Sequence, residues 1–498
     1  LVCCENGEPI QMLSGHPDVD SIIFTGGTQT ALKLLEKRPD AELSAETGGK
    51  NATIVTAMAD RDQTVEHVLH SAFSHSGQKC SATSLLILEK EVYEDETFRK
   101  QLLDAIQTLK VGSVWNFSNK MGPLIREPLE NLRRGLETLE DGESWALQPK
   151  CDERNLKLWH PAVKWGVKRG SFSHQTEFFG PLLSVMKAES LDDAIEIVND
   201  TNYGLTSGLE SLDPREQKIW SEKIKAGNLY INRVTTGAIV LRQSFGGMEL
   251  SAIGAGIKAG SPNYAVQFCR IEESKPYGDS PTQGPLREES PLLYLARNWQ
   301  TQLTRNEHAE IRSELQKTIE AIYSCLYQYE REFSGEQDFF RLRGQDNLFR
   351  YLPIGKVTVR MHPDDGLVET LIRIAAARIA KCKVEISLPT DLNNSVTEFL
   401  AGTDGKRLCD SVEILTENDE NLADRILVTD PPSKIDRVRY ALPNRVPQVI
   451  HQAAAKLGKH ISRHVPLAEG RIEMLRYLRE QSISVDYHRY GNLGEREL

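Results

Sequence analysis

Three short motifs constrain this chain more than any other feature of its sequence, because each combines glycine with one acidic or nucleophilic side chain. They span residues 45–51 (Ala-Glu-Thr-Gly-Gly-Lys-Asn), residues 76–82 (Ser-Gly-Gln-Lys-Cys-Ser-Ala) and residues 177–181 (Glu-Phe-Phe-Gly-Pro). Any one of them alone is a weak indicator of function. Together, and in this order, they favour a catalytic α/β protein over a purely structural one.

Cys80, in the second motif, is a candidate nucleophile. Its neighbours in the sequence are small, polar or basic residues rather than core hydrophobes. A thiol attacks as its thiolate, so we expect surroundings that lower the pKa of Cys80 and a backbone, including Gly77, that leaves the sulfur accessible. The alternative is a buried structural cysteine, which is the commoner role for a cysteine considered alone.

The three motifs resemble those of the aldehyde dehydrogenase superfamily. That superfamily carries a general-base Glu in Glu-Leu-Gly-Gly-Lys, a nucleophile in Gly-Gln-x-Cys and a cofactor-binding Glu in Glu-x-Phe-Gly-Pro. The resemblance implies that Cys80 is the nucleophile, that Glu46 is the base, and that Glu177 and Phe179 contact the nicotinamide side of NAD. Thr47 stands where the superfamily usually has Leu.

A strand, a glycine turn and a helix are predicted near the start of the chain. Residues 19–24 are rich in β-branched side chains, Gly26 and Gly27 follow, and a helical pattern begins near Ala31. Such a turn lets a phosphate approach helix N–H groups, although an ordinary βα turn has the same pattern. By resemblance, residues 24–28 lie beside the NAD pyrophosphate.

The resemblance also gives the set of cofactor-binding residues. Those expected to bind NAD are Gly26, Gly27, Thr47, Gly48, Glu177 and Phe179. No metal ligands are assigned.

A later loop narrows the resemblance to one subfamily. Residues 235–240 and 243–247 look like the substrate-anchoring region of L-glutamate γ-semialdehyde dehydrogenases. In that subfamily a serine after the nucleophile and backbone amides of a glycine-containing loop hold the substrate carboxylate. Ser81, Gly237 and Ala238 occupy those positions here, although a plain turn is the alternative for this loop.

The implied activity is NAD-dependent oxidation of L-glutamate γ-semialdehyde, the hydrolysed form of Δ1-pyrroline-5-carboxylate, to L-glutamate in proline catabolism. A thioester on Cys80 would be hydrolysed with Glu46 as base. Two alternatives stay open at this point. In the first alternative, the chain is a non-catalytic assembly or active-site lid module. In the second, it is a dehydrogenase for a different aldehyde.

Composition excludes several classes of protein. A net charge of −11 argues against nucleic acid or an anionic membrane as the main partner. No apolar run is long enough to span a bilayer. The eight cysteines lack a disulfide-like spacing, so we expect reduced thiols and a cytoplasmic location.

A length of 498 residues predicts more than one domain. We expect an aldehyde dehydrogenase fold, made of a partial Rossmann-like coenzyme domain and an α/β catalytic domain, followed by a degenerate aldehyde-dehydrogenase-like α/β domain without catalytic motifs. The expected boundaries are 1–50 for the partial NAD-binding domain, 51–270 for the catalytic domain, 271–292 for a linker and 293–498 for the non-catalytic domain.

Within the last region, a βαβ unit is predicted over residues 356–388, with further strands at 411–415 and 425–429. Residues 479–495 closely resemble the C-terminus of long proline utilization A proteins. These bifunctional enzymes join an FAD-dependent proline dehydrogenase to the semialdehyde dehydrogenase. The resemblance implies that FAD belongs only to a proline dehydrogenase domain of the same parent chain, and homo-oligomers are possible.

The sequence begins at Leu1 and contains no Pro-Trp-Asn-Phe-Pro motif, which supplies the oxyanion-hole Asn of the superfamily. We therefore expect the chain to be a fragment of a longer protein. By itself it should bind NAD weakly and turn over slowly.

Overall fold

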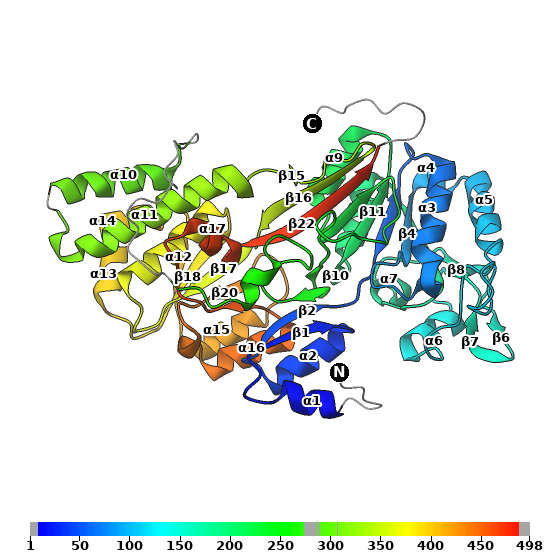
Figure 1. The fold of residues 1–498 in the computed structure, drawn as a ribbon, viewed down its shortest axis with the longest axis horizontal. Coiled ribbons are helices and arrows are strands. Elements are labelled where there is room, and N and C mark those ends of the chain that lie inside the picture. Colours follow the sequence, from blue (N-terminus) through cyan, green and yellow to red (C-terminus); the bar gives the residue numbers. More distant parts are fainter. Residues whose placement is uncertain (1–7, 273–285, 287–288, 306, 488–498) are drawn as a thin grey trace.

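The computed structural model describes residues 8–272, 286, 289–305 and 307–487, which form mixed α/β structure (Figure 1). The α/β class expected from the sequence is confirmed. Two large sheets, one of ten strands and one of five, dominate the described part of the chain.

The ten-stranded sheet has the order β15-β16-β22-β12-β11-β3-β4-β9-β8-β5. Strands β22 to β8 in this order run parallel, while β15, β16 and β5 pair antiparallel with their neighbours. The strands are β3 (Ala52–Val55), β4 (Leu85–Glu89), β5 (Ser144–Leu147), β8 (Ala162–Trp165), β9 (Leu182–Ala188), β11 (Thr206–Glu210), β12 (Asn228–Ile231), β15 (Gln337–Asp338), β16 (Gln345–Pro353) and β22 (Leu478–Asp486).

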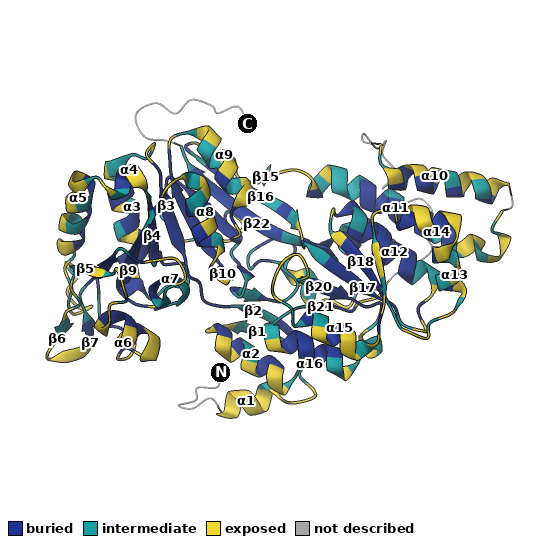
Figure 2. Ribbon diagram, turned by 180° about the vertical axis from the view of Figure 1, so that it is seen from behind, coloured by how far each residue is buried: buried dark blue, intermediate teal, exposed yellow. Residues whose placement is uncertain are grey.

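The central strands of this sheet are buried on both faces (Figure 2). β3 reads Ala-Thr-Ile-Val without alternation, as expected for a parallel strand covered on two sides. Ile54 packs in a cluster with α8 (Leu191–Asn199) and α9 (Pro214–Lys223), whereas Val55 packs with α3 (Arg61–Phe73) and α5 (Glu96–Gln107). The sheet therefore lies between two helical layers.

A smaller sheet carries the first motif. β1 (Ser21–Thr25) pairs parallel with β2 (Glu42–Glu46), and β14 (Ala252–Ile253) pairs antiparallel with β2. Helix α2 (Thr28–Lys37) connects β1 to β2, so the predicted strand–turn–helix unit is confirmed. The remaining short elements of this half are α1 (Glu8–Ser14), α4 (Lys90–Tyr93), α6 (Glu130–Glu137), α7 (Phe172–Gln175), β6 (Cys151–Asp152), β7 (Asn155–Trp159), β10 (Tyr203–Gly204) and β13 (Met248–Glu249).

The second half of the chain, which follows the expected linker at 271–292, contains a parallel five-stranded sheet of order β19-β18-β17-β20-β21. Its strands are β17 (Lys356–Arg360), β18 (Lys383–Leu388), β19 (Glu413–Thr416), β20 (Arg437–Arg439) and β21 (Ile461–Ser462). The predicted βαβ unit is confirmed, with α12 (Leu367–Ile379) between β17 and β18. The other helices are α10 (Pro291–Thr304), α11 (Arg312–Gln328), α13 (Ser395–Ala401), α14 (Thr403–Leu408), α15 (Asp419–Ile426), α16 (Gln448–Leu457) and α17 (Gly470–Glu473).

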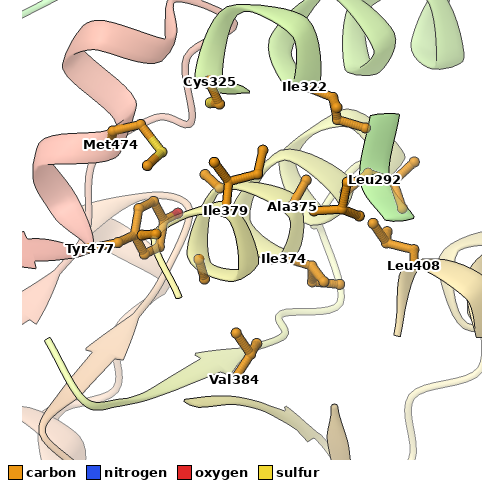
Figure 3. Close-up of a cluster of buried hydrophobic side chains, with 14 of the residues drawn as sticks. Leu292, Ile322, Cys325, Ile374, Ala375, Ile379, Val384, Leu408, Met474 and Tyr477 are labelled. Carbon is orange, nitrogen blue, oxygen red and sulfur yellow. The ribbon is translucent and has the colours of Figure 1, made fainter. Parts of the chain in front are cut away.

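Helix α12 is the centre of the apolar core of the second half (Figure 3). Ala375 and Ile379 lie on the side of α12 that faces Ile322 and Cys325 of α11, whereas Ile374 lies on the side toward Val384 of β18. This core is separate from the two clusters that cover the ten-stranded sheet.

One strand prediction was wrong. The segment predicted as a strand at 425–429 overlaps α15, which extends to Ile426. The side chain of Asn418 caps this helix by accepting a hydrogen bond from the Asn421 amide, at 2.8 Å. Leu422 and Ile426 then lie one turn apart on its buried face.

The two halves share one sheet. β22 inserts between β12 and β16, and its register with β16 covers nine residue pairs from Gln345↔Asp486 to Pro353↔Leu478 (Figure 1). The ten-stranded sheet thus crosses the expected linker at 271–292, and the domain boundaries remain predictions. Residues 273–285 and 287–288 of that linker lie outside the described residues, while Pro291 already begins α10.

No helix in the described part of the chain is long and apolar enough to cross a membrane.

Candidate functional site

Cys80 lies in a tight turn that follows α3. His75 and Ser76, with φ angles of 54° and 58°, and Gly77, with φ 68°, turn the chain away from the helix axis. The Ala82 amide then donates to the Lys79 carbonyl at 3.0 Å, which places Cys80 inside the turn. Left-handed backbone at two non-glycine residues is costly and is characteristic of functional loops.

Asn51 fixes this turn to the large sheet. Its Nδ2 donates to the carbonyls of Cys80 and Ala82, at 2.6 and 2.9 Å, and its Oδ1 accepts from the Thr206 amide at 3.1 Å. Asn51 is 2% exposed, so these bonds are made in a dry environment where they hold the turn most firmly. Asn51 was not predicted as a site residue, although it belongs to the first motif.

The third motif packs against the first two. Glu177 Oε1 accepts from the Gly49 amide at 3.0 Å. A Cβ on Gly48 would overlap the carboxylate of Glu177, and a Cβ on Gly77 would overlap the carbonyl of Gly180. Glycine is therefore required at Gly77, where the clash is with backbone, whereas a side chain at Gly48 would displace the carboxylate of Glu177.

Phe179 follows Glu177 with a left-handed φ of 51° and is 44% exposed. Its carbonyl accepts from Gln78 Nε2 at 3.4 Å, while Gln78 Oε1 accepts from the Ile125 amide at 2.9 Å. Gln78 thus connects the cysteine turn to the third motif. An exposed aromatic ring on strained backbone beside the site is available to cover a ligand.

Glu46 ends β2 and is held by a glycine peptide. Its Oε2 accepts from the Gly247 amide at 3.0 Å. The carbonyl of the same peptide unit, on Gly246, accepts from Lys258 Nζ at 2.5 Å. The ammonium group of Lys258 therefore polarises the peptide that binds Glu46.

Lys258 is 2% exposed and has only neutral acceptors at its ammonium group. Besides Gly246, it donates to the Gly227 carbonyl at 2.6 Å and to Asn228 Oδ1 at 3.0 Å. Burial lowers the pKa of Lys258, and the charge of Glu46 opposes this. Burial likewise raises the pKa of Glu46 to about 7, against the opposing effects of Lys258 and the Gly247 amide.

The electrostatics at Cys80 differ from the expectation. Burial, and then the charges of Glu177 and Glu46, raise the pKa of the Cys80 thiol, while the Ser81 amide opposes them by hydrogen bonding to the sulfur. The prediction of a lowered pKa was therefore wrong for the chain without ligands. The basic residue next to Cys80 in sequence, Lys79, does not outweigh two nearby carboxylates.

The glycine turn of the first unit leaves open space at the start of α2. Gly27 is the N-cap residue of α2, has no side-chain cap, and has open space where a Cβ would be. The register Thr25↔Glu46 brings this turn and the residues after β2 to the same carboxyl edge of the small sheet. Ligands of open α/β sheets bind at such edges, so Gly26 and Gly27 fit a dinucleotide phosphate.

Thr47 and Gly48 follow Glu46 at this edge. The hydroxyl of Thr47 donates to the Leu250 carbonyl at 2.5 Å, and the hydroxyl of Thr28 donates to the same atom at 3.2 Å. Thr47 is 2% exposed. Its side chain thus connects the end of β2 to the loop that binds Glu46. Its amide donates to the Ser251 carbonyl at 3.0 Å, so the carbonyl of Thr47 is the group left to face a ligand.

The residues expected to anchor a carboxylate lie close to one another. The hydroxyl of Thr235 donates to the Ser81 carbonyl at 3.1 Å, which connects the loop after β12 to the cysteine turn. Gly237 has φ 87° and open space around it. Within the described residues, the amides of Gly237 and Ala238 have no hydrogen-bond partner.

The second half reaches this site through Glu480 of β22. Its Oε2 accepts from the Lys258 amide at 2.7 Å, and its Oε1 accepts from Ser261 Oγ and Asn263 Nδ2 at 3.1 and 2.8 Å. Neither Lys258 nor Glu480 was predicted from the sequence. The sequence offers one indication of their importance, which is that both stand in segments that resemble the family. Their contact with each other joins residues more than two hundred positions apart, so it could not be read from local sequence.

The described residues contain no group of three or more His, Cys, Asp or Glu side chains arranged to hold a metal ion. The six cysteines in the described ranges are free thiols.

The sequence matches the aldehyde dehydrogenase family over residues 1–273. It is 32% identical over 278 residues to a 1-pyrroline-5-carboxylate dehydrogenase of Oceanobacillus iheyensis, covering 53% of this chain and 53% of that protein. It is 33% identical over 275 residues to a Staphylococcus aureus protein of the same name, covering 53% of this chain and 52% of that protein.

Among solved structures, proline utilization A from Corynebacterium freiburgense is similar with a TM-score of 0.76 and 37% identity. That similarity covers 96% of this chain and 43% of the other chain, so it includes both halves described above. The chain spans about half the length of the curated relatives that it matches.

Proposed function

The chain belongs to the aldehyde dehydrogenase family and has its α/β fold, and on this premise we propose that it oxidises an aldehyde at Cys80 with NAD. The single observation that carries the proposal is the convergence of the three motifs. Glu177 binds the backbone of the first motif, and both Glu177 and Glu46 lie close enough to Cys80 to raise its pKa. The residues proposed as nucleophile, base and cofactor-binding carboxylate thus lie near one another, which supports the proposal.

NAD, when bound, would supply the acceptor for the hydride that leaves the aldehyde carbon. Gly26 and Gly27 would hold its pyrophosphate, Glu177 would bind the ribose beside the nicotinamide, and Phe179 would cover the ring. Thr47 and Gly48 would contribute backbone contacts at the same edge of the sheet.

Cys80 and Glu46 perform the two covalent steps of the proposal. The sulfur of Cys80 bonds to the aldehyde carbon, and the backbone amide of Cys80 stabilises the oxyanion that forms. After loss of hydride, the carbon is held as a thioester. Glu46 accepts a proton from water, the water oxygen bonds to that carbon, and the C–S bond breaks to release the acid and the thiol.

We propose L-glutamate γ-semialdehyde as the substrate and L-glutamate as the product, in proline catabolism. The names of the Oceanobacillus and Staphylococcus relatives support this, because 1-pyrroline-5-carboxylate hydrolyses to this semialdehyde. The free amides of Gly237 and Ala238, beside Ser81, suit a substrate carboxylate.

The similarity to proline utilization A supports a parent protein in the cytoplasm that also contains an FAD-dependent proline dehydrogenase domain, with homo-oligomers as a further possibility. In this proposal the region from residue 293 onward is a non-catalytic aldehyde-dehydrogenase-like domain, because its sequence lacks the cysteine and glutamate motifs.

The test is NADH formation by the chain, at enzyme concentrations high enough to observe slow turnover. The substrates are glutamate semialdehyde and pentanal, which has the same number of carbon atoms but neither the carboxylate nor the amino group. Cys80→Ala should abolish NADH formation, whereas Cys269→Ala, at an exposed thiol, should leave it unchanged.

Ser81→Ala should raise the KM for the semialdehyde by roughly tenfold and leave that for pentanal unchanged, as loss of one hydrogen bond to a charged group predicts. NADH formation that survives Cys80→Ala would refute the proposed nucleophile. Equal effects of Ser81→Ala on both aldehydes would refute the proposed substrate.

A further inference from the structure

A cavity of about 470 Å³ lies where the two halves of the chain meet. One wall is the loop from Gly247 to Lys258, together with residues 44–46 of β2. The opposite wall comes from the second half, including Arg437 of β20, Lys459 after α16 and Arg479 of β22. Its volume is within the range of small-molecule sites.

The lining carries more positive than negative charge. It contains five Lys or Arg side chains and three Asp or Glu side chains. Lys434 forms ion pairs with two of these acids, Glu249 at 2.6 Å and Asp436 at 3.5 Å. Arg479 reaches Glu249 only at 4.0 Å.

Arg437 and Lys459 have no carboxylate partner within the described residues. Arg437 donates to the carbonyls of Arg476 and Ala255, at 2.7 and 2.8 Å, and its Nε has no hydrogen-bond partner there. Arg437 is 4% exposed. Lys459 Nζ donates only to the carbonyls of Ile426 and Val428, at 2.5 and 3.1 Å.

The surroundings of Arg437 and Lys459 destabilise the charged form of each side chain. Burial, followed by the nearby charge of Arg479, lowers the pKa of Arg437 to about 9. Burial, followed by the charge of Lys434, lowers the pKa of Lys459 to about 8. A negative ligand would relieve both effects, because an opposite charge at short range favours the charged form of a base.

Part of the remaining lining is apolar and suits a carbon skeleton. Ile257 and Ile354 line it, together with backbone of the glycine-rich loop at Gly254 and Gly256. We propose that this cavity binds a small organic dianion, whose short apolar body lies against the isoleucines and whose charges pair with Arg437, Lys459 and Arg479. Either a dicarboxylate or a phosphate ester has this chemistry.

This binding site goes beyond the proposed aldehyde oxidation. Glu46 is part of its wall, but Cys80, Glu177, Gly26 and Gly27 do not line it. A bound dianion would connect β2 and its loop to β20 and β22, so occupancy would stabilise the junction of the two halves.

The test is isothermal titration calorimetry of the chain with glutarate, a dicarboxylate, and with glycerol 3-phosphate, a phosphate ester. Neutral glutaramide, with the carbon skeleton of glutarate, is the ligand control. We expect saturable binding of at least one anion and none of glutaramide. Tighter binding of either anion supports the site and identifies its headgroup.

Two variants test the location. Lys459→Gln should weaken binding at least about tenfold, as loss of one charge-assisted contact predicts. Lys456→Gln, at an exposed lysine of α16, removes the same charge and should leave binding unchanged. Ile257→Phe keeps all charges but fills the cavity, and should also weaken binding.

Absence of saturable binding by both anions would overturn the proposal. So would equal binding by wild type, Lys459→Gln and Ile257→Phe, or equal weakening by Lys456→Gln and Lys459→Gln. The titration needs neither NAD nor turnover, so its outcome is independent of the proposed aldehyde oxidation.

Discussion

At the scale of single residues, burial and two carboxylates together set the reactivity of Cys80. Burial and the charges of Glu177 and Glu46 raise the pKa of its thiol. Only the thiolate attacks, so the reactive fraction at neutral pH is small and grows as the pH rises. Both effects therefore favour the protonated form of Cys80.

We predict that removing either carboxylate charge lowers the pKa of Cys80. Glu177→Gln should lower it more than Glu46→Gln, because Glu177 is the larger of the two charge effects. The measurement is the rate of iodoacetamide alkylation of Cys80 between about pH 7 and about pH 10. An alkylation profile that is the same in wild type and both variants would show that burial alone sets this pKa.

Lys258 should control the base through the Gly246–Gly247 peptide. Its charge lowers the pKa of Glu46 and so opposes burial. We predict that Lys258→Met shifts the rising limb of the pH dependence of kcat to higher pH, because Glu46 must lose its proton to act as base. At pH 7 the rate should fall by roughly tenfold.

Lys218→Met, at an exposed lysine of α9, is the matched control and should leave the profile unchanged. A pH profile of Lys258→Met that coincides with that of wild type would contradict a role of Lys258 at the base, even if the variant were slower at every pH.

The sequence predicted those site residues whose signals are local. Cys80, Glu46 and Glu177 stand in short motifs, and the structure brings those motifs together. Asn51, Lys258 and Glu480 were missed because each acts through a partner distant in the chain. The sign of the pKa shift at Cys80 was mispredicted for the same reason, since adjacent residues do not reveal which carboxylates fold against a thiol.

At the scale of elements, the bend after α3 decides where the nucleophile lies. Gly77 combines φ 68° with contact against the Gly180 carbonyl. Gly77→Ala should therefore displace the cysteine turn from the third motif and lower kcat by roughly a hundredfold, the size of effect that a misplacement of about 1 Å can have.

Gly170→Ala is a matched control for this prediction. Gly170 also has a left-handed φ, of 81°, but has open space where a Cβ would be. Gly170→Ala thus introduces backbone strain similar to that of Gly77→Ala, but without a clash against a neighbouring carbonyl. Equal losses of kcat in both variants would show that backbone strain, rather than contact between the motifs, explains the effect.

The elements themselves were predictable where their patterns were simple. The strand–turn–helix unit of β1 and α2 and the βαβ unit around α12 were predicted from the sequence. The segment at 425–429 was misassigned because its short run of apolar residues fits a strand, while the cap at Asn418 and the spacing of Leu422 and Ile426 fit a helix.

At the scale of the whole molecule, the last described strand makes the two halves interdependent. β22 is a central strand of the ten-stranded sheet, and Glu480 within it binds the Lys258 backbone. The pairing could not be foreseen, because a strand near the end of the sequence carries no signal for the partner it selects. A division of the chain into independent domains would have to separate this sheet.

We predict that Ser482→Pro destabilises both halves. The Ser482 amide donates to the Gly227 carbonyl at 3.0 Å, and proline removes that donor from a central strand. The thermal midpoint should fall by at least roughly 5 °C, and NADH formation should fall with it. Gln337→Pro, in the edge strand β15, should change the midpoint much less.

Equal midpoints for wild type and Ser482→Pro would show that the shared sheet contributes little to stability. A lowered midpoint with unchanged activity would show that the second half supports the fold but not the catalytic site.

The central claim is that Cys80 carries the substrate as a thioester which Glu46 helps to hydrolyse. Its most direct test is peptide mass spectrometry of Glu46→Gln after incubation with NAD and glutamate semialdehyde. We predict a glutamyl group on the Cys80 peptide, and none when NAD is omitted. An unmodified Cys80 peptide, or a glutamyl group on another cysteine, would contradict it.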